Sequence, residues 1–188
     1  MKQSQINNAI RKASTAFSKH QWFLPPNPKW DVTDFGLGDF DTTGLTSVNL
    51  AEQQEYCEKI MYVKHNQVTP NHYHDKKKED IICRIGSLAL QFYSEEPTVS
   101  LQVNGVFQDL SVNCLLILQA GERVTLTQGI RHAFWAKSEY AIVGEVSTAN
   151  DDTNDNFFQN PKIGRFSEII EDEPAIIKLV SEQKGDLE

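Results

Sequence analysis

The chain has 188 residues, of which 39% are hydrophobic and 23% are charged, and this length and composition suit one globular domain spanning residues 1–188. Its formal net charge of -8 opposes attraction to nucleic acid and to anionic membrane surfaces. The cysteines lack disulfide-like or metal-like spacing, and no apolar stretch reaches about 18 residues, so we expect a cytoplasmic protein that does not enter a membrane.

Residues 1–43 predict a helix followed by a proline-rich strap. Residues 3–19 carry apolar side chains at spacings of three and four, as in a helix with one buried face: Ile6, Ile10, Ala13 and Phe17. The strap contains Pro25, Pro26 and Pro28. Because proline fixes φ and lacks an N–H group, we expect the strap to be extended and to join the helix to the rest of the domain.

Residues 44–150 predict an all-β unit. Nine short apolar segments alternate with turn residues and have no helical period: TSVNLA, EKIMYVKH, EDIICRI, SLALQFY, VSLQV, CLLILQA, ERVTLTQ, HAFWA and YAIVGEVS. Asn104 and Gly105 tolerate positive φ and predict a two-residue hairpin turn. An antiparallel jelly-roll β-barrel is the economical architecture. Residues 151–188 predict a C-terminal extension, in which an Asn- and Asp-rich loop precedes a helix over residues 167–183.

Four side chains suggest a site for one divalent metal ion. His72 and His74 are two residues apart, so both would leave the same face of a strand. Glu79 opens the next apolar segment, and His132 opens a later one. Imidazole and carboxylate groups are the usual ligands where thiolates are absent. For a His-x-His pair alone, the alternative is that the rings pack in a core or lie at the surface.

The spacing of these four residues resembles the two cupin motifs. In the first motif, His72 and His74 are followed after four residues by Glu79 and after six more by Gly86, and Asn66 replaces the leading glycine. The second motif contains Gly121, Gly129 and His132, with Thr127 in place of the usual proline and Ala136 in place of the usual asparagine. The resemblance covers roughly residues 45–150 and implies a cupin jelly roll whose four metal ligands point into the barrel.

Two longer segments, residues 58–84 and residues 144–166, resemble the bacterial D-lyxose isomerases, a cupin family that interconverts aldoses and ketoses. The likeness extends over most of the chain. It implies interconversion of D-lyxose and D-xylulose, with D-mannose and D-fructose as a related pair, by proton transfer between C1 and C2 of the open-chain sugar. It also implies one divalent ion, preferably Mn²⁺ with Fe²⁺, Co²⁺ or Zn²⁺ as alternatives, and a homodimer.

Such a reaction needs a proton-transferring base and charge stabilisation near the metal. Glu145 is the candidate base, because strand alternation places it on the same face as Ala141 and Val143, and an inward face would raise its pKa. Lys59 is the candidate for charge stabilisation, because strand alternation places it on the same face as Met61. The alternatives are that Glu145 faces solvent and that Lys59 is an exposed strand lysine.

Contacts to the sugar are expected from the C-terminal extension and from the last ligand strand. Asp152, Asp155 and Arg165 would hydrogen-bond sugar hydroxyls if residues 147–166 cap the barrel mouth, although a solvated loop with its own Asx turns is the alternative. Trp135 and the neighbouring Phe134 would offer a ring to a sugar face or fill the core. The basic turn formed by residues 76–78 is interpreted as solvated.

Two other functions fit the same four ligands. A non-haem iron dioxygenase uses this ligand set as well, but its cavity would be lined with aliphatic side chains, whereas a sugar isomerase needs several hydrogen-bonding groups. A non-catalytic sugar-binding cupin would use the metal only to hold its ligand and would lack a base near the bound carbon. The polarity of the cavity and the position of Glu145 therefore separate the three hypotheses.

Overall fold

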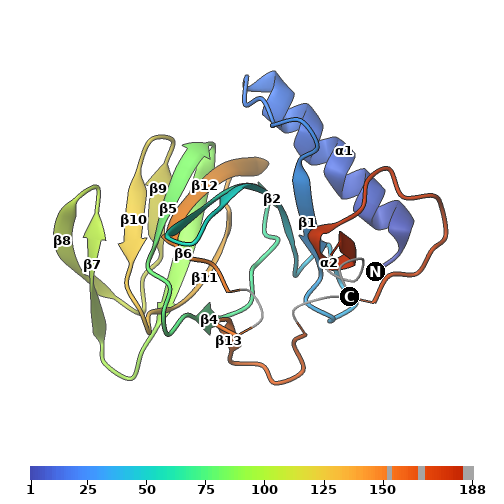
Figure 1. The fold of residues 1–188 in the computed structure, drawn as a ribbon. Coiled ribbons are helices and arrows are strands. Elements are labelled where there is room, and N and C mark those ends of the chain that lie inside the picture. The colour runs from blue at the N-terminus through green and yellow to red at the C-terminus, as the bar shows by residue number, and fades with distance from the viewer. Residues whose placement is uncertain (152–153, 165–167, 184–188) are drawn as a thin grey trace.

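Two antiparallel β-sheets face each other in the computed structural model, which describes residues 1–151, 154–164 and 168–183 (Figure 1). The larger sheet contains, in spatial order, β1 (Lys29–Thr33), β2 (Leu45–Glu52), β3 (Tyr56–Lys64), β12 (Tyr140–Thr148), β5 (Glu79–Ile85), β10 (Arg123–Leu126), β7 (Thr98–Val103) and β8 (Val106–Ser111). The smaller sheet contains β13 (Phe157–Phe158), β4 (His72–Tyr73), β11 (Arg131–Ala136), β6 (Ser87–Tyr93) and β9 (Leu116–Gln119). The antiparallel sheets form the predicted cupin-type jelly roll, so the predicted all-β fold is confirmed.

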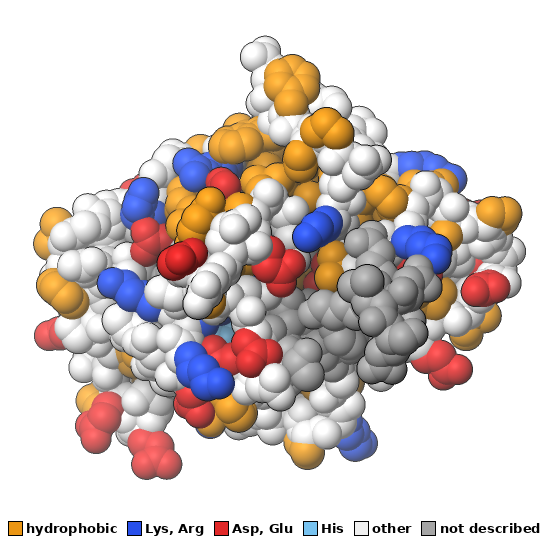
Figure 2. Space-filling model, viewed as in Figure 1, with side chains coloured by type: hydrophobic (Ala, Val, Ile, Leu, Met, Phe, Trp, Pro, Cys, Tyr) orange, Lys and Arg blue, Asp and Glu red, His pale blue; other side chains and the backbone are white. Residues whose placement is uncertain are grey.

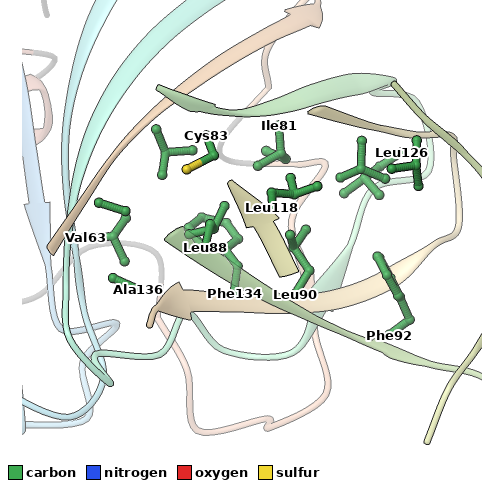
Figure 3. Packing of buried hydrophobic residues seen from close by; sticks show 14 of the residues in the cluster. Val63, Ile81, Cys83, Leu88, Leu90, Phe92, Leu118, Leu126, Phe134 and Ala136 are labelled. Atoms are coloured by element: carbon green, nitrogen blue, oxygen red, sulfur yellow. The ribbon is translucent and has the colours of Figure 1, made fainter. Parts of the chain in front are cut away.

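The space between the sheets is filled by side chains that alternate along each strand. On β5, for example, Ile81 and Cys83 point inward, and on β6 Leu88 and Leu90 point inward. Figure 3 shows these residues meeting Leu118 and other apolar side chains between the two layers. Strand alternation therefore produces one continuous apolar core.

The first helix, α1 (Gln3–Lys19), packs against the outer face of the larger sheet and confirms the predicted range. Its apolar stripe includes Ile10 and Phe17, which pack in one cluster with Val48 and Ile60 from the outward faces of β2 and β3. Figure 1 shows the helix lying beside β1. The residues of α1 thus cover the outer face of the larger sheet at β1, β2 and β3. Among the described residues, no helix is long and apolar enough to span a membrane.

The nine predicted strand segments all form strands, and the Asn104–Gly105 turn has positive φ values of 52° and 81°. The structure adds β1, β4, β8 and β13 to them. Of these, β1 and β13 lie outside the segment 44–150 expected for the barrel. Residues 29–33 were expected to continue the strap, but they alternate buried apolar and polar side chains and pair with β2.

The helix predicted over residues 167–183 is wrong for the described part of that range. Only α2 (Val180–Gln183) is helical there. Pro174 disfavours a helical conformation for the preceding residue and supplies no N–H. The segment before it instead holds the start of α1, because Asp172 accepts hydrogen bonds from Ser4 and Glu173 accepts one from Asn7. These bonds join two segments far apart in the sequence.

Candidate active site

A cavity opens at one end of the barrel. Both sheets contribute to its wall, together with the segment that contains β13. Figure 2 shows histidine recessed in one face of the molecule, beside acidic and basic side chains. The four predicted metal ligands line this cavity: His72, His74, Glu79 and His132. The structure thus brings residues from β4, β5, β11 and the turn after β4 to one place.

The ligand candidates converge on one oxygen of Glu79. Oε1 of Glu79 lies 3.3 Å from Nε2 of His132 and 3.6 Å from Nε2 of His74. The ring of His72 lies 4.3 Å from that of His132, between centroids, because the two residues are register partners in β4 and β11. Nε2 of His74, Nε2 of His132 and Oε1 of Glu79 are buried and have no hydrogen-bond partner.

Hydrogen bonds at the opposite ring nitrogens fix the orientation of all three histidines. Nδ1 of His72 lies 2.9 Å from the carbonyl oxygen of Pro70, and Nδ1 of His132 lies 3.0 Å from that of Ile130. Nδ1 of His74 bonds the carbonyl oxygen of Asp155. A carbonyl oxygen can only accept, so Nδ1 carries the proton, and a neutral ring with this tautomer presents the lone pair of Nε2. Burial lowers the pKa of His72 well below its usual value, which favours this neutral form.

These buried atoms fit a divalent cation, since neutral imidazole nitrogens and a carboxylate oxygen are a common donor set for one. Unpartnered buried polar atoms are costly, and a cation would satisfy three of them at once. In the described part of the chain, no group of three or more His, Cys, Asp or Glu side chains is placed so that it could hold a metal ion. The donor chemistry and orientation are in place, and metal binding itself remains a prediction.

Lys77 lies between two carboxylates in the cavity, contrary to the interpretation of the basic turn as wholly solvated. Its ammonium nitrogen is 2.8 Å from Oε2 of Glu79 and 3.0 Å from Oε1 of Glu145. Burial alone would lower the pKa of Lys77, but Glu145 and Glu79 raise it, so the side chain is a cation. Burial likewise would raise the pKa of Glu79, yet the Lys77 ammonium holds it well below its usual value. The two-residue spacing between Lys77 and Glu79 was the signal that both side chains share a face.

Both candidates for acid–base chemistry point into the cavity. Glu145 on β12 is 6% exposed and lines the wall, as the inward alternative required. Lys59 is its direct register partner on β3, is 8% exposed and donates a hydrogen bond to Asn150 at 3.2 Å. The exposed-lysine alternative for Lys59 is therefore wrong. Glu145 and Lys77 form one hydrogen-bonded pair beside the histidine cluster.

Two of the residues predicted to contact the sugar do not line the cavity. Trp135 lies on the face of β11 opposite His132 and Phe134 and is not part of the cavity wall. Asp155 is buried, but its carboxylate bonds backbone N–H groups of residues 75–77 and does not line the cavity. The expectation that these two residues meet a sugar is thus wrong, because strand parity and a local turn direct them elsewhere. Arg165 and Asp152 lie outside the described residues.

Polar side chains that the sequence interpretation missed complete the wall. Asp31 and Thr33 come from β1, Ser47 comes from β2, and Asn156 comes from the segment before β13. The signal was the alternation of polar and apolar residues in KWDVT, which the expectation of a strap obscured. The cavity therefore surrounds the histidine cluster with hydrogen-bonding groups and not only with aliphatic ones.

The fold and the cavity together define the class of this protein as a cupin-type jelly roll with a polar, histidine-rich cavity. Solved structures agree on the fold: a mutant Acinetobacter sp. DL28 L-ribose isomerase in complex with L-ribose superposes with a TM-score of 0.70. That match covers 87% of this chain and 96% of the other at 15% identity. The L-ribose isomerase of Cellulomonas parahominis gives a TM-score of 0.68 at 17% identity, over 87% of this chain and 96% of that one.

The particular family follows from the sequence comparisons. Residues 27–183 match the family model described as D-lyxose isomerase. The chain is 35% identical to the D-lyxose/D-mannose isomerase of Escherichia coli O157:H7, over 98% of this chain and 99% of that protein. It is also 35% identical to the D-lyxose/D-mannose isomerase of Serratia proteamaculans, over 93% and 94% of the two chains. The chain belongs to the D-lyxose isomerase family, a family of enzymes.

Proposed function

We propose that this protein is a metal-dependent aldose–ketose isomerase that interconverts D-lyxose and D-xylulose, with D-mannose and D-fructose as a second pair. Two relatives, each matched over more than nine tenths of both chains and both named D-lyxose/D-mannose isomerase, support the choice of substrates. The observation that carries the proposal is the buried Lys77–Glu145 pair beside three oriented histidines in a polar cavity. A site of this kind can bind a sugar and move its protons.

The metal ligands would be His72, His74, Glu79 and His132. The neutral rings and the ionised carboxylate suit Mn²⁺, and they also suit Fe²⁺, Co²⁺ or Zn²⁺, among which ligand type alone does not choose. When bound, such an ion supplies Lewis acidity to the carbonyl oxygen and the adjacent hydroxyl oxygen of an open-chain sugar. The side chains around it must then bind the rest of the sugar and handle the protons.

Glu145 and Lys77 divide the proton transfers between them. The Glu145 carboxylate removes the proton from C2 of the aldose and returns it to C1, while the electron pair of the C2–H bond forms the new double bond. Lys77 assists transfer of the O2 proton to O1, so that an aldehyde and a secondary alcohol become a primary alcohol and a ketone. The close contact of the two side chains lets the ammonium offset negative charge as it develops on oxygen.

Hydroxyls farther along the sugar would be bound by the opposite wall. Asp31, Thr33 and Ser47 project from β1 and β2 into the cavity, and Lys59 adds a positive charge beside Glu145. This polarity favours a sugar over the apolar substrate of a dioxygenase, and the base beside the histidines disfavours a purely binding role. We also propose a cytoplasmic homodimer, which light scattering of the purified protein and cell fractionation would test.

The test is an assay of the purified, Mn²⁺-loaded protein against a panel of aldopentoses and aldohexoses. We expect conversion of D-lyxose, loss of C2-deuterium from labelled sugar to solvent, and a decrease in kcat of about a thousandfold in Glu145→Gln. Glu145→Gln keeps the shape of the side chain, so its metal content should match that of the native protein. If the protein converts none of these sugars but consumes oxygen with another substrate, the isomerase hypothesis is wrong and the dioxygenase hypothesis takes its place.

A further inference from the structure

Asp155 lies in the segment that follows β12 and leads into β13. This segment pairs with β4, the strand that contains His72. Two residues later, β13 pairs with β4, so that Phe158 is the register partner of His72. The rings of Phe158 and His72 lie 5.7 Å apart between centroids. Asp155 itself is 2% exposed, although it is a charged residue type that is seldom buried without partners. Its burial therefore requires an explanation.

The carboxylate of Asp155 is surrounded by three successive backbone N–H groups. Its Oδ1 accepts from Asp75 at 2.9 Å and from Lys76 at 3.0 Å, and its Oδ2 accepts from Lys77 at 2.9 Å. Successive N–H groups that converge in this way form an anion-binding concavity, which here is filled by a side chain of the same molecule. The bonds fix the backbone of the turn from which the Lys77 side chain departs.

A second contact from the same residue reaches the histidine cluster. The backbone carbonyl oxygen of Asp155 accepts the Nδ1 proton of His74. Asp155 thus contacts the ring of His74 through its carbonyl and the backbone of Lys77 through its carboxylate. Its neighbours Asn156 and Phe158 line the cavity, whereas Asp155 does not. A direct contact of its carboxylate with substrate would also require breaking the bonds to the turn.

We propose that Asp155 is a positioning residue, which fixes the turn of residues 75–77 so that the Lys77 ammonium lies between Glu79 and Glu145 and the His74 ring faces the metal site. Its effect on catalysis rests on the proposed isomerase function, whereas its effect on the turn does not. Because a displacement of about 1 Å at a reacting group reduces rates strongly, loss of the carboxylate should act on kcat through Lys77.

Two variants and a control test this role. Asp155→Ala removes every acceptor contact to the three turn amides, while Asp155→Asn keeps one carbonyl oxygen and places an amide NH₂ group where Oδ2 accepts from Lys77. The control is Asp39→Asn, since Asp39 accepts hydrogen bonds from Thr42 in a similar turn but is exposed and does not line the cavity. If Asp155→Ala fails to fold, the nearly isosteric Asp155→Asn still provides the test.

The first measurement does not depend on activity. In the metal-free protein, we expect amide hydrogen exchange of residues 75–77 to become faster in both Asp155 variants, with little change in the strands of the core. Titration with Mn²⁺ should show about tenfold weaker binding, because loss of the carboxylate contacts frees the backbone at residue 155 to shift, and with it the carbonyl oxygen that orients His74. Unchanged exchange of the turn amides would overturn the proposal even if the variants were inactive. These two results stand if the protein proves not to isomerise sugars.

The second measurement is kinetic. With the sugar that the native enzyme converts, we expect kcat of Asp155→Ala to fall about 10- to 100-fold at a nearly unchanged KM, and Asp155→Asn to recover part of the loss. In a Lys77→Met background, Asp155→Ala should cause little further loss, because the two residues act as a unit. A raised KM at unchanged kcat would instead mark Asp155 as a sugar contact, and fully additive losses would show that it does not act through Lys77.

Discussion

The two ends of the barrel interior use the same strands but opposite chemistry. At the mouth, β3 and β12 place Lys59 directly opposite Glu145. Four residues deeper on each strand, the facing pair is Val63 and Ala141, both of which are buried in the apolar core. One inward-facing row of side chains thus changes from charged to apolar within about two repeats of the strand pleat.

We infer from this difference that the apolar end of the barrel stabilises the fold and that the charged end serves the chemistry of the site. Apolar side chains at the closed end gain free energy from burial without needing partners. At the mouth, Lys77, Glu79 and Glu145 must offset the cost of desolvation by pairing with one another. Replacing a buried ion network by apolar residues is often neutral or stabilising, so its presence is better explained by function than by stability.

The largest effect is expected when the ion network at the mouth is broken. Lys77→Met removes the cation between Glu79 and Glu145 and leaves two buried carboxylates facing each other. We expect kcat to fall about a thousandfold, because the group that assists proton transfer is lost. We also expect the metal-free protein to lose about 3 kcal/mol of unfolding free energy. Steady-state kinetics and urea unfolding measure the two effects.

The matched control for that variant is Lys78→Met, which removes the same side chain one position further along. Lys78 is exposed, whereas Lys77 is buried, although both belong to one basic turn. The control should keep the native kcat and the native stability. Equal losses in the two variants would contradict the assignment of Lys77 as the buried member of the turn.

A substitution at the apolar end of the barrel should have the opposite effect: it should lower stability and leave kcat nearly unchanged. Leu118 is fully buried between the sheets and lies on β9, which contributes no residue to the cavity wall. Leu118→Ala should cost about 2 to 5 kcal/mol of unfolding free energy, since it removes buried methyl groups and leaves a void. At temperatures where the variant remains folded, kcat should be nearly unchanged. A large loss of kcat with little loss of stability would show that the two ends are not separable.

The sequence predicted the barrel and the histidine cluster because both depend on local patterns. Alternation placed Lys59 on the face of Met61 and Glu145 on the face of Ala141 and Val143. The structure then shows that both faces point inward. The pair of histidines two residues apart on one strand is likewise local. The nine predicted strands and α1 followed from turn residues and apolar periodicity, whereas β1, β4, β8 and β13 did not.

The rest depended on contacts between distant segments. Asp155 resembled a loop residue available to a sugar, but its carboxylate binds a turn about 80 positions earlier in the chain. Lys77 resembled a solvated lysine until its two carboxylate partners, from different strands, were known. Trp135 was misplaced for a simpler reason, since its parity on β11 is opposite to that of His132. Tertiary partners decide such cases, and local patterns do not contain them.

The smallest effect expected is a difference in thiol exposure between the two ends. Cys57 lies near the mouth and Cys83 lies in the core, and burial raises the pKa of each to about 11, whereas Cys114 is exposed. Since thiolates react and a raised pKa keeps both buried thiols protonated below pH 11, only Cys114 should be labelled in the native protein at pH 8. In urea below the unfolding midpoint, Cys57 should become reactive before Cys83, because the charged mouth has fewer apolar contacts to hold it closed. Mass spectrometry of the labelled peptides would separate the three sites, and simultaneous labelling of Cys57 and Cys83 would mean that the barrel opens as one cooperative unit.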